Sequence, residues 1–188
     1  HERVSGQESR PARTMFRSMS NRDFSQTIDR WLSRGATAAK LDKLTPRDKQ
    51  SDGSFEMDVE FSAANYGQLM QNRLLVFKPT IANRTDAVYL TEKDRKHPVM
   101  LDSNSFNEKV TVTLPAGFSV DEVPDAVSLD TAFGKYATTY VVKDGKLVFT
   151  RSLTTKRTMV AVEKYKEVRD FFTSMLNAEQ SPVVLLRK

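Results

Sequence analysis

Residues 109–153 constrain the fold most strongly, because they combine strand-like alternation with well-marked turns. Apolar residues recur at every second position, so each strand is expected to bury one face and expose the other. Asp144-Gly145 separates two such runs and is typical of a type I′ hairpin, whose turn needs positive φ angles. The alternating residues are Val110, Val112, Leu114, Phe118, Val120, Tyr136, Thr138, Tyr140, Val142, Leu147, Phe149 and Leu153. The segment predicts four short strands.

Two other segments have the residue spacing of amphipathic helices. The first covers residues 20–34, where Ser20 and Asp23 resemble a capping box and Gly35 is expected to end the helix in left-handed geometry. One face of it carries Phe24, Ile28, Trp31 and Leu32. The second helix follows the strands, and its predicted apolar stripe is Val162, Tyr165, Arg169, Phe172, Met175 and Leu176, flanked by Val168.

Short apolar runs predict further strands around these segments. They are a truncated edge strand within 1–13, then 37–46 ending at Pro46, 54–61, 74–77, 99–101 and 183–186. Neighbouring strands with only two amphipathic helices packed on them favour an α+β fold that is mainly antiparallel, with a sandwich-like C-terminal half. The polar stretch 80–97 marks a boundary. We therefore expect a β-α-β-β linker or subdomain over 1–96 and a β-sandwich-like domain, with a helix and a final strand, over 97–188.

Composition excludes several kinds of chemistry within this chain. Its 188 residues include no cysteine, which excludes disulfides, thiolate metal sites and a cysteine nucleophile. Apolar runs stay far below the roughly 20 residues that span a bilayer, so no membrane insertion is expected. The net charge of +5 is spread along the chain, and acids accompany even the cluster Lys93, Arg95, Lys96 and His97. We expect a solvated surface and no nucleic-acid binding, and keep an anionic-polymer site as the alternative.

Acidic and histidine residues do not form a recognisable site. The acidic candidates lie along or just before the predicted strand 54–61; they are Asp52, Glu56, Asp58 and Glu60. A straight strand spreads its carboxylates apart, whereas Ca²⁺ needs oxygens that converge on one point. Cross-strand pairing with Lys40 and Lys43 is the structural interpretation. The histidines, His1 and His97, cannot make a zinc site without cysteine or further histidines. Phosphate-loop, dinucleotide-binding and nucleophile-elbow motifs are absent.

Arginines and aromatic residues at apolar positions are the remaining candidates. Arg151 and Arg169 each lie among apolar neighbours, so their stems are expected to pack and their guanidinium groups to meet an acid or a carbonyl. The aromatic set is Phe118, Phe133, Tyr136, Tyr140 and Phe149, which we interpret as sheet core rather than a base-stacking surface. Asn83-Arg84-Thr85 matches a glycosylation acceptor only formally. No catalytic, cofactor-binding or metal-binding residue is therefore predicted.

Several short motifs resemble one bacterial family. They are His97-Pro98-Val99, Val110 to Phe118 with its Leu114-Pro115-Ala116-Gly117 turn, Val123-Pro124, Phe133-Gly134-Lys135-Tyr136, Lys146-Leu147, Arg151, Tyr165, Arg169 and Phe171. Together they resemble the C-terminal region, of the domain of unknown function 3858 type, of transglutaminase-like proteins that also carry an N-terminal domain of unknown function. The resemblance is best over about 97–188. Residues 1–96 more weakly resemble the segment that joins the transglutaminase-like domain to this end domain.

The resemblance implies a secreted parent protein, periplasmic or extracellular, in which this chain is a fragment. The family's Cys-His-Asp centre belongs to the preceding domain, so no catalytic residue transfers to this cysteine-free chain and no cofactor is implied. The expected role is a non-catalytic accessory or interaction domain, with the preceding transglutaminase-like domain and a further protein as partners. The alternatives are a binding module for nucleic acid or envelope polysaccharide, and a hydrolase using two distant carboxylates.

Overall fold

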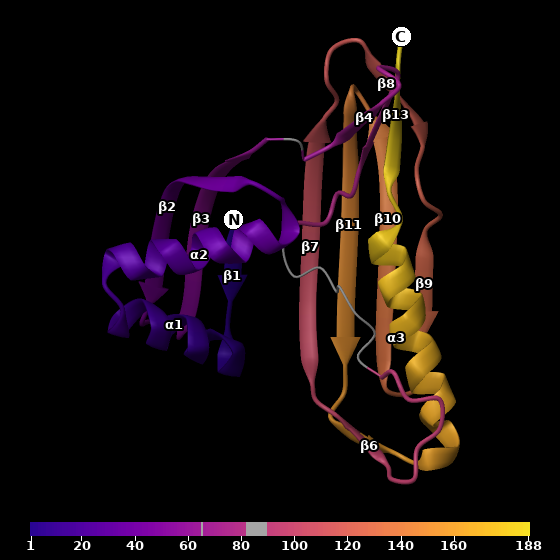
Figure 1. Cartoon of the computed structure of the whole chain (residues 1–188). Helices are drawn as coiled ribbons and strands as arrows, with labels where there is room; N and C mark the ends of the chain where they lie inside the picture. Colours follow the sequence, from indigo (N-terminus) through magenta and orange to yellow (C-terminus); the bar gives the residue numbers. More distant parts are fainter. Residues whose placement is uncertain (65, 82–89) are drawn as a thin grey trace. The chain divides into compact units, whose positions relative to one another are not determined.

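The computed structural model describes residues 1–64, 66–81 and 90–188. They form two compact units, His1–Tyr66 and Gly67–Lys188 (Figure 1). The fold is α+β with antiparallel sheets, which confirms the predicted class, but the described residues form three α-helices where the sequence predicted two. The predicted Asn83-Arg84-Thr85 acceptor lies outside the described residues.

Unit 1 is a three-stranded sheet with two α-helices on one face. Its elements are β1 Glu2–Val4, a 3-10 turn Gly6–Glu8, α1 Ser9–Ser18, α2 Asn21–Gly35, β2 Ala39–Lys49 and β3 Ser54–Ala63. The strand order is β1-β3-β2. Phe24, Ile28 and Leu32 of α2 pack with Phe55 and Met57 of β3, so the helices bury the apolar row of the central strand.

The helix α2 begins as predicted but ends differently. The Asp23 backbone N–H donates to the Ser20 side chain at 3.2 Å, which confirms the cap. The prediction for Gly35 is wrong, because the cap residue Ala36 is extended (φ −137°) and positive φ falls on Ala38 instead. The Ala39 N–H donates to the Ala36 carbonyl at 3.1 Å, so the chain turns directly into β2.

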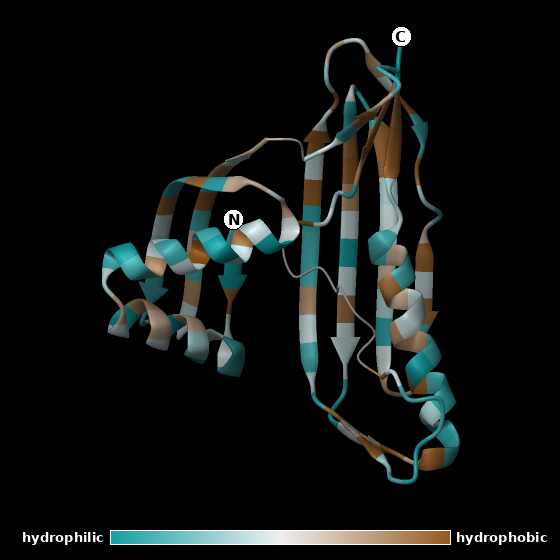
Figure 2. Cartoon of the chain, viewed as in Figure 1, coloured by the Kyte–Doolittle hydropathy of each residue, from teal (hydrophilic) through white to brown (hydrophobic). Residues whose placement is uncertain are grey.

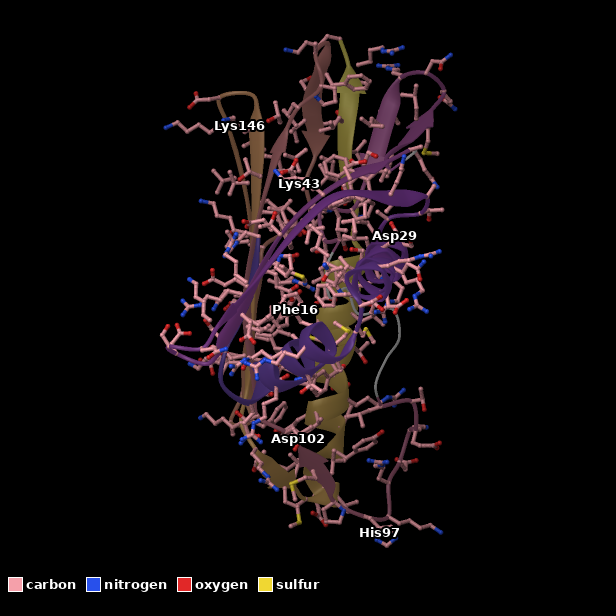
Figure 3. All side chains as sticks on the ribbon, turned by 90° about the vertical axis from the view of Figure 1, so that its left-hand side faces the viewer. Phe16, Asp29, Lys43, His97, Asp102 and Lys146 are labelled. Carbon is pink, nitrogen blue, oxygen red and sulfur yellow. The ribbon has the colours of Figure 1, made fainter. Side chains whose placement is uncertain are left out.

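The additional helix, α1, replaces most of the edge strand predicted within residues 1–13. Only Glu2–Val4 is extended, and Pro11 lies in the first turn of α1, where its missing N–H has no helical partner to lose. Phe16 of α1 lies 5.3 Å from Phe24 and 5.5 Å from Phe55 between ring centroids, and Figure 3 labels it. The contact between Phe16 and Phe55 joins segments 39 residues apart, so the residues near the N-terminus do not by themselves indicate that α1 packs there.

The strand β2 passes through Pro46, which was predicted to end it. Pro46 lies opposite Met57, and the pairing continues to Lys49 opposite Ser54. β2 is an edge strand, so proline there can leave its missing N–H on the unpaired side.

Unit 2 combines three sheets with one long helix. Its elements are β4 Gln68–Met70, β5 Leu74–Phe77, β6 Val99–Leu101, β7 Asn104–Thr113, β8 Phe118–Glu122, β9 Val127–Asp130, β10 Gly134–Lys143, β11 Lys146–Thr155, β12 Thr158–Val160, a 3-10 turn Val162–Lys164, α3 Tyr165–Gln180 and β13 Val183–Arg187. The strand orders are β7-β11-β10-β9, β4-β5-β13-β8 and β12-β6.

The segment 109–153 contributes five strands, not four, to two different sheets. The Asp144-Gly145 hairpin is confirmed, with φ of 51° and 68° at the turn and Lys143 paired with Lys146. The short strand β9 was missed. β8 pairs with β13 rather than with β7, because the chain crosses from one sheet to the other at the Pro115–Gly117 turn.

The helix α3 and strand β13 lie in one layer over the sheet β7-β11-β10-β9 (Figures 1 and 3). The hydrophobic residues of β13 stand out in Figure 2, and Val183 and Leu185 are fully buried. The buried face of α3 is Tyr165, Val168, Phe171, Met175 and Glu179. Tyr165 and Met175 lie on this face as predicted, but Val168 and Phe171 replace Arg169 and Phe172, so Arg169 is only half-buried.

Residues 67–81 belong to the compact unit that contains the C-terminal strand. β5 pairs with β13, with Phe77 opposite Val183, and this pairing ties residues before the polar stretch to the chain's end. The division into a linker or subdomain over 1–96 and a domain over 97–188 stays a prediction.

Gly145→Ala tests the hairpin. We expect it to lower the free energy of unfolding by about 1 kcal/mol, because an L side chain is strained at φ +68°. No atom lies within 4 Å of the added Cβ, so strain in the backbone is the cause. Urea unfolding measures the change. Asp144→Asn is the matched control and should be close to neutral, since asparagine tolerates this geometry; equal stability of all three proteins would contradict the turn.

Candidate functional site

Arg151 lies in the middle of the buried row of β11. The row is Leu147, Phe149, Arg151, Leu153 and Thr155, and Arg151 is only 2% exposed. A guanidinium in such a place needs partners, because an unpaired buried charge is strongly unfavourable. Arg151 is therefore the first candidate for a functional residue.

Two carboxylates meet the Arg151 guanidinium from different elements. Nε lies 3.0 Å from Glu108 Oε2, and Nη1 lies 2.7 Å from Glu179 Oε1. Glu108 is the residue directly opposite Arg151 on β7, while Glu179 is in the last turn of α3. Cζ of Arg151 also lies 4.7 Å from the centroid of the Phe106 ring. The cluster thus joins the sheet to the helix that covers it.

Burial alters the proton affinity of groups around Arg151. Desolvation raises the pKa of Glu108 and outweighs the opposing effect of Arg151. Desolvation raises the pKa of Tyr140 to about 12, and burial followed by the charge of Glu179 raises that of Tyr136. Both phenols therefore remain neutral near pH 7. Neutral phenols and an arginine already contacting two acids supply neither a nucleophile nor a base.

The prediction for Arg151 agrees with this geometry, but the sequence analysis did not single out its partners. Glu108 alternates with Phe106 and Val110, so it occupies the inward row of an alternating strand. Glu179 lies four residues after Met175 on the buried face of α3. A charged residue on an apolar row was therefore a readable signal in both places. Arg169, the other candidate arginine, is half-buried on α3, and the ion pairs of the cluster join Arg151 to Glu108 and Glu179 instead.

The acids of β3 pair with cations on the outer face of the unit 1 sheet. The Lys43 ammonium lies 3.0 Å from Glu60, as predicted, and Figure 3 labels Lys43. Lys40, also predicted to pair with these acids, lies opposite Ser62. The cations that pair with Asp52, Glu56 and Asp58 are Arg3, Arg47 and Lys49. The hydrogen bond from Lys49 lowers the pKa of Glu56, and those from Ser54 lower that of Asp52. These carboxylates are ionised partners in a charge network.

The two histidines belong to different compact units. His1 Nδ1 lies 2.7 Å from Asp58 Oδ1, and His97 is in the exposed loop before β6 (Figure 3). In the same loop, the Arg95 guanidinium lies 5.7 Å from the Tyr165 ring. Across residues 1–64, 66–81 and 90–188, no group of three or more histidine or acidic residues could hold a metal ion.

The aromatic residues singled out from the sequence are mostly core. Phe133, Tyr136 and Phe149 are 5%, 1% and 2% exposed. Tyr140 lies 5.0 Å from Phe149 between ring centroids, and Phe118 receives the Arg187 guanidinium at 5.4 Å. They do not form an open stacking platform.

Unit 1 contains a small apolar cavity of about 60 Å³ between β1, α1, α2 and β3. It is lined by Glu2, Val4, Ala12, Met15, Phe24, Ile28, Phe55 and Met57. Burial raises the pKa of Glu2 at its wall.

None of the helices formed by the described residues is long and apolar enough to cross a membrane.

Comparison with known proteins identifies the family. The model of a domain of unknown function with solved structures, DUF3858, matches residues 72–185, which is more than half of the chain. This chain belongs to the DUF3858 family. The match begins at residue 72, whereas the resemblance predicted from the sequence is best from about residue 97. The match therefore also includes β5. No curated protein matches the chain.

A solved structure supports the fold of this DUF3858 protein. It is the crystal structure of a candidate protease from Parabacteroides distasonis, with 15% sequence identity and a TM-score of 0.53. The match covers 63% of this chain but only 24% of that chain. The likeness shows a shared fold and a chain that spans about a quarter of the larger protein.

Arg151→Met tests the buried cluster. Removing the guanidinium leaves Glu108 and Glu179 without this partner, and breaking a buried ion pair typically costs about 3–5 kcal/mol of stability. Urea unfolding should show a loss of that order. Lys135→Met is the matched control, because Lys135 makes an exposed ion pair with Asp130 on the same sheet and should cost below about 1 kcal/mol. Equal losses would contradict the structural importance of Arg151.

Glu108→Gln tests the pKa direction. Because the folded-state pKa lies above 4.5, the folded protein binds this proton more tightly than the unfolded chain does. Glu108 therefore favours folding at low pH, and that contribution is lost as pH rises through its raised pKa. Wild type should lose stability relative to Glu108→Gln as pH rises above the ordinary glutamate range.

Glu56→Gln gives the opposite control for that measurement. The pKa of Glu56 is lowered, so wild type should gain stability relative to Glu56→Gln as pH rises above the ordinary glutamate range. Urea unfolding over a pH series compares both pairs of proteins. Parallel curves for Glu108→Gln and wild type would exclude a raised pKa.

Proposed function

We propose that this chain is a non-catalytic accessory or interaction domain of a larger secreted protein of the transglutaminase-like type. The observation that carries the proposal is the structural match, which covers most of this chain and only 24% of the larger one. A DUF3858 domain that forms a small part of a candidate protease is most simply an attachment to a catalytic module elsewhere in the chain.

The chemistry of the described side chains supports the same role. Arg151 is occupied by Glu108 and Glu179, and the acids of β3 are paired with cations. The chain contains no cysteine, so a Cys-His-Asp centre must come from another domain of the parent protein. Motifs shared with the transglutaminase-like family lie at turns and in the core, which preserves a scaffold rather than a reaction.

The proposed partner is the preceding transglutaminase-like domain of the same chain, in the periplasm or outside the cell. Attachment would position that domain or add contacts to its protein substrate. Association of domains within one chain needs little intrinsic affinity, because the linker keeps the local concentration high. An accessory role therefore does not require a high-affinity site for the catalytic domain.

Deletion of this domain from the full-length gene product tests the proposal. The purified chain alone should neither cleave nor cross-link casein-derived peptides, while the full-length protein does so and its deletion variant is impaired in substrate affinity or stability. Catalytic activity of the isolated chain that persists after repurification would overturn a non-catalytic role. The Arg151→Met variant, purified in the same way, is the control. Binding to heparin that falls steeply with salt would instead favour the anionic-polymer alternative.

A further inference from the structure

The strand β7 is a long and regular edge of the sheet β7-β11-β10-β9. It has ten residues, Asn104–Thr113, and all of them pair with β11 in one uninterrupted register. No strand among the described residues pairs with its other side. Natural edge strands are usually shortened or protected by proline or a bulge. The opposite edge fits that rule, because β9 has only four residues and Pro124 precedes it.

The core is open along β7. The inward row of β7, formed by Phe106, Glu108, Val110 and Val112, is only partly buried. The facing row on β11, formed by Leu147, Phe149, Arg151 and Leu153, is at most 6% exposed. Another strand beside β7 would therefore bury further apolar surface and would satisfy unpaired backbone groups at the same time.

We propose that β7 is a docking edge for an extended partner segment that alternates apolar and polar residues and places a lysine or arginine beside Glu108. The apolar residues would continue the row of Phe106, Val110 and Val112. The polar residues would continue the exposed row of Asn107, Lys109 and Thr111 on the other face. Main-chain hydrogen bonds supply affinity in such strand addition, and the alternate side chains supply selectivity.

Charge selects the cation. The Glu108 side chain is 17% exposed and shares Arg151 with Glu179. A segment that covered β7 would remove the remaining water from this carboxylate, which is costly unless a new opposite charge arrives. A basic residue directly opposite Glu108 replaces that water, whereas an acidic residue there adds repulsion.

A second copy of this chain fits the edge less well. Pairing two β7 strands antiparallel with matching faces would place a member of the inward row beside Glu108. That row contains Asn104, Phe106, Glu108, Val110 and Val112, and none of these is a cation. The cation of β7, Lys109, projects on the opposite face. The occupant is therefore a different segment, and the site does not depend on the accessory role proposed above.

Peptide binding tests the edge. The probe is a short synthetic peptide that alternates threonine with valine and carries lysine in place of the central valine; its matched control carries glutamate there. Titration into the isotope-labelled chain should shift backbone amide NMR signals of β7 first. The lysine peptide should bind about tenfold more tightly than the glutamate peptide. A version N-methylated on its edge-facing amides should not bind.

Variants of the chain identify the carboxylate. In Glu108→Gln the preference for lysine should fall to about twofold or less, whereas Lys109→Glu on the other face should retain it. If Glu108→Gln does not fold, the N-methylated peptide and the shift map on wild type still decide. Equal binding of lysine and glutamate peptides, shifts away from β7, no binding at millimolar peptide, or a dimer joined through β7 would each overturn the proposal. None of these outcomes bears on catalysis by the parent protein.

Discussion

The guanidinium of Arg151 holds together two layers of unit 2. It contacts Glu108 on the neighbouring strand and Glu179 in the last turn of α3. The last turn of α3 has no basic residue of its own, and an acid there is unfavourable next to the negative end of the helix dipole. Arg151, a cation on the sheet, compensates for the missing basic residue and for the acid at this end of the helix. Packing of α3 through Val168, Phe171 and Met175 thus depends on an ion pair at its end.

The same cluster links the stability of unit 2 to the edge of its sheet. Its charged groups contact one another, and burial raises the pKa of the neighbouring phenols, so both stay neutral near pH 7. Glu108, however, belongs to an edge strand. A cluster that joins two layers therefore places a partly exposed carboxylate on a ten-residue edge strand of the sheet β7-β11-β10-β9.

Local features were predictable where a few neighbouring residues decide the geometry. The cap at Ser20 and the turn at Asp144-Gly145 were predicted because each depends on residues within one turn of chain. The predictions for Pro46 and residues 1–13 were wrong because strand order and contacts between separate segments decided them, and the prediction for Gly35 was wrong because the chain enters β2 straight after the helix. Ala36 turns the chain into β2, an edge position accepts Pro46, and Phe16 packs on Phe24 and Phe55.

The sequence by itself determined the α+β class, most strands, the helices α2 and α3, and the absence of cysteine chemistry. Period-two and helical spacing are properties of single segments, so they can be read without a partner. Only the tertiary structure decided that Glu108 and Glu179, 71 positions apart in the numbering, meet at Arg151, and that β7 is left at an edge. Strand order and ion pairing depend on which segments meet in space, and a burial pattern along one segment does not specify its neighbour.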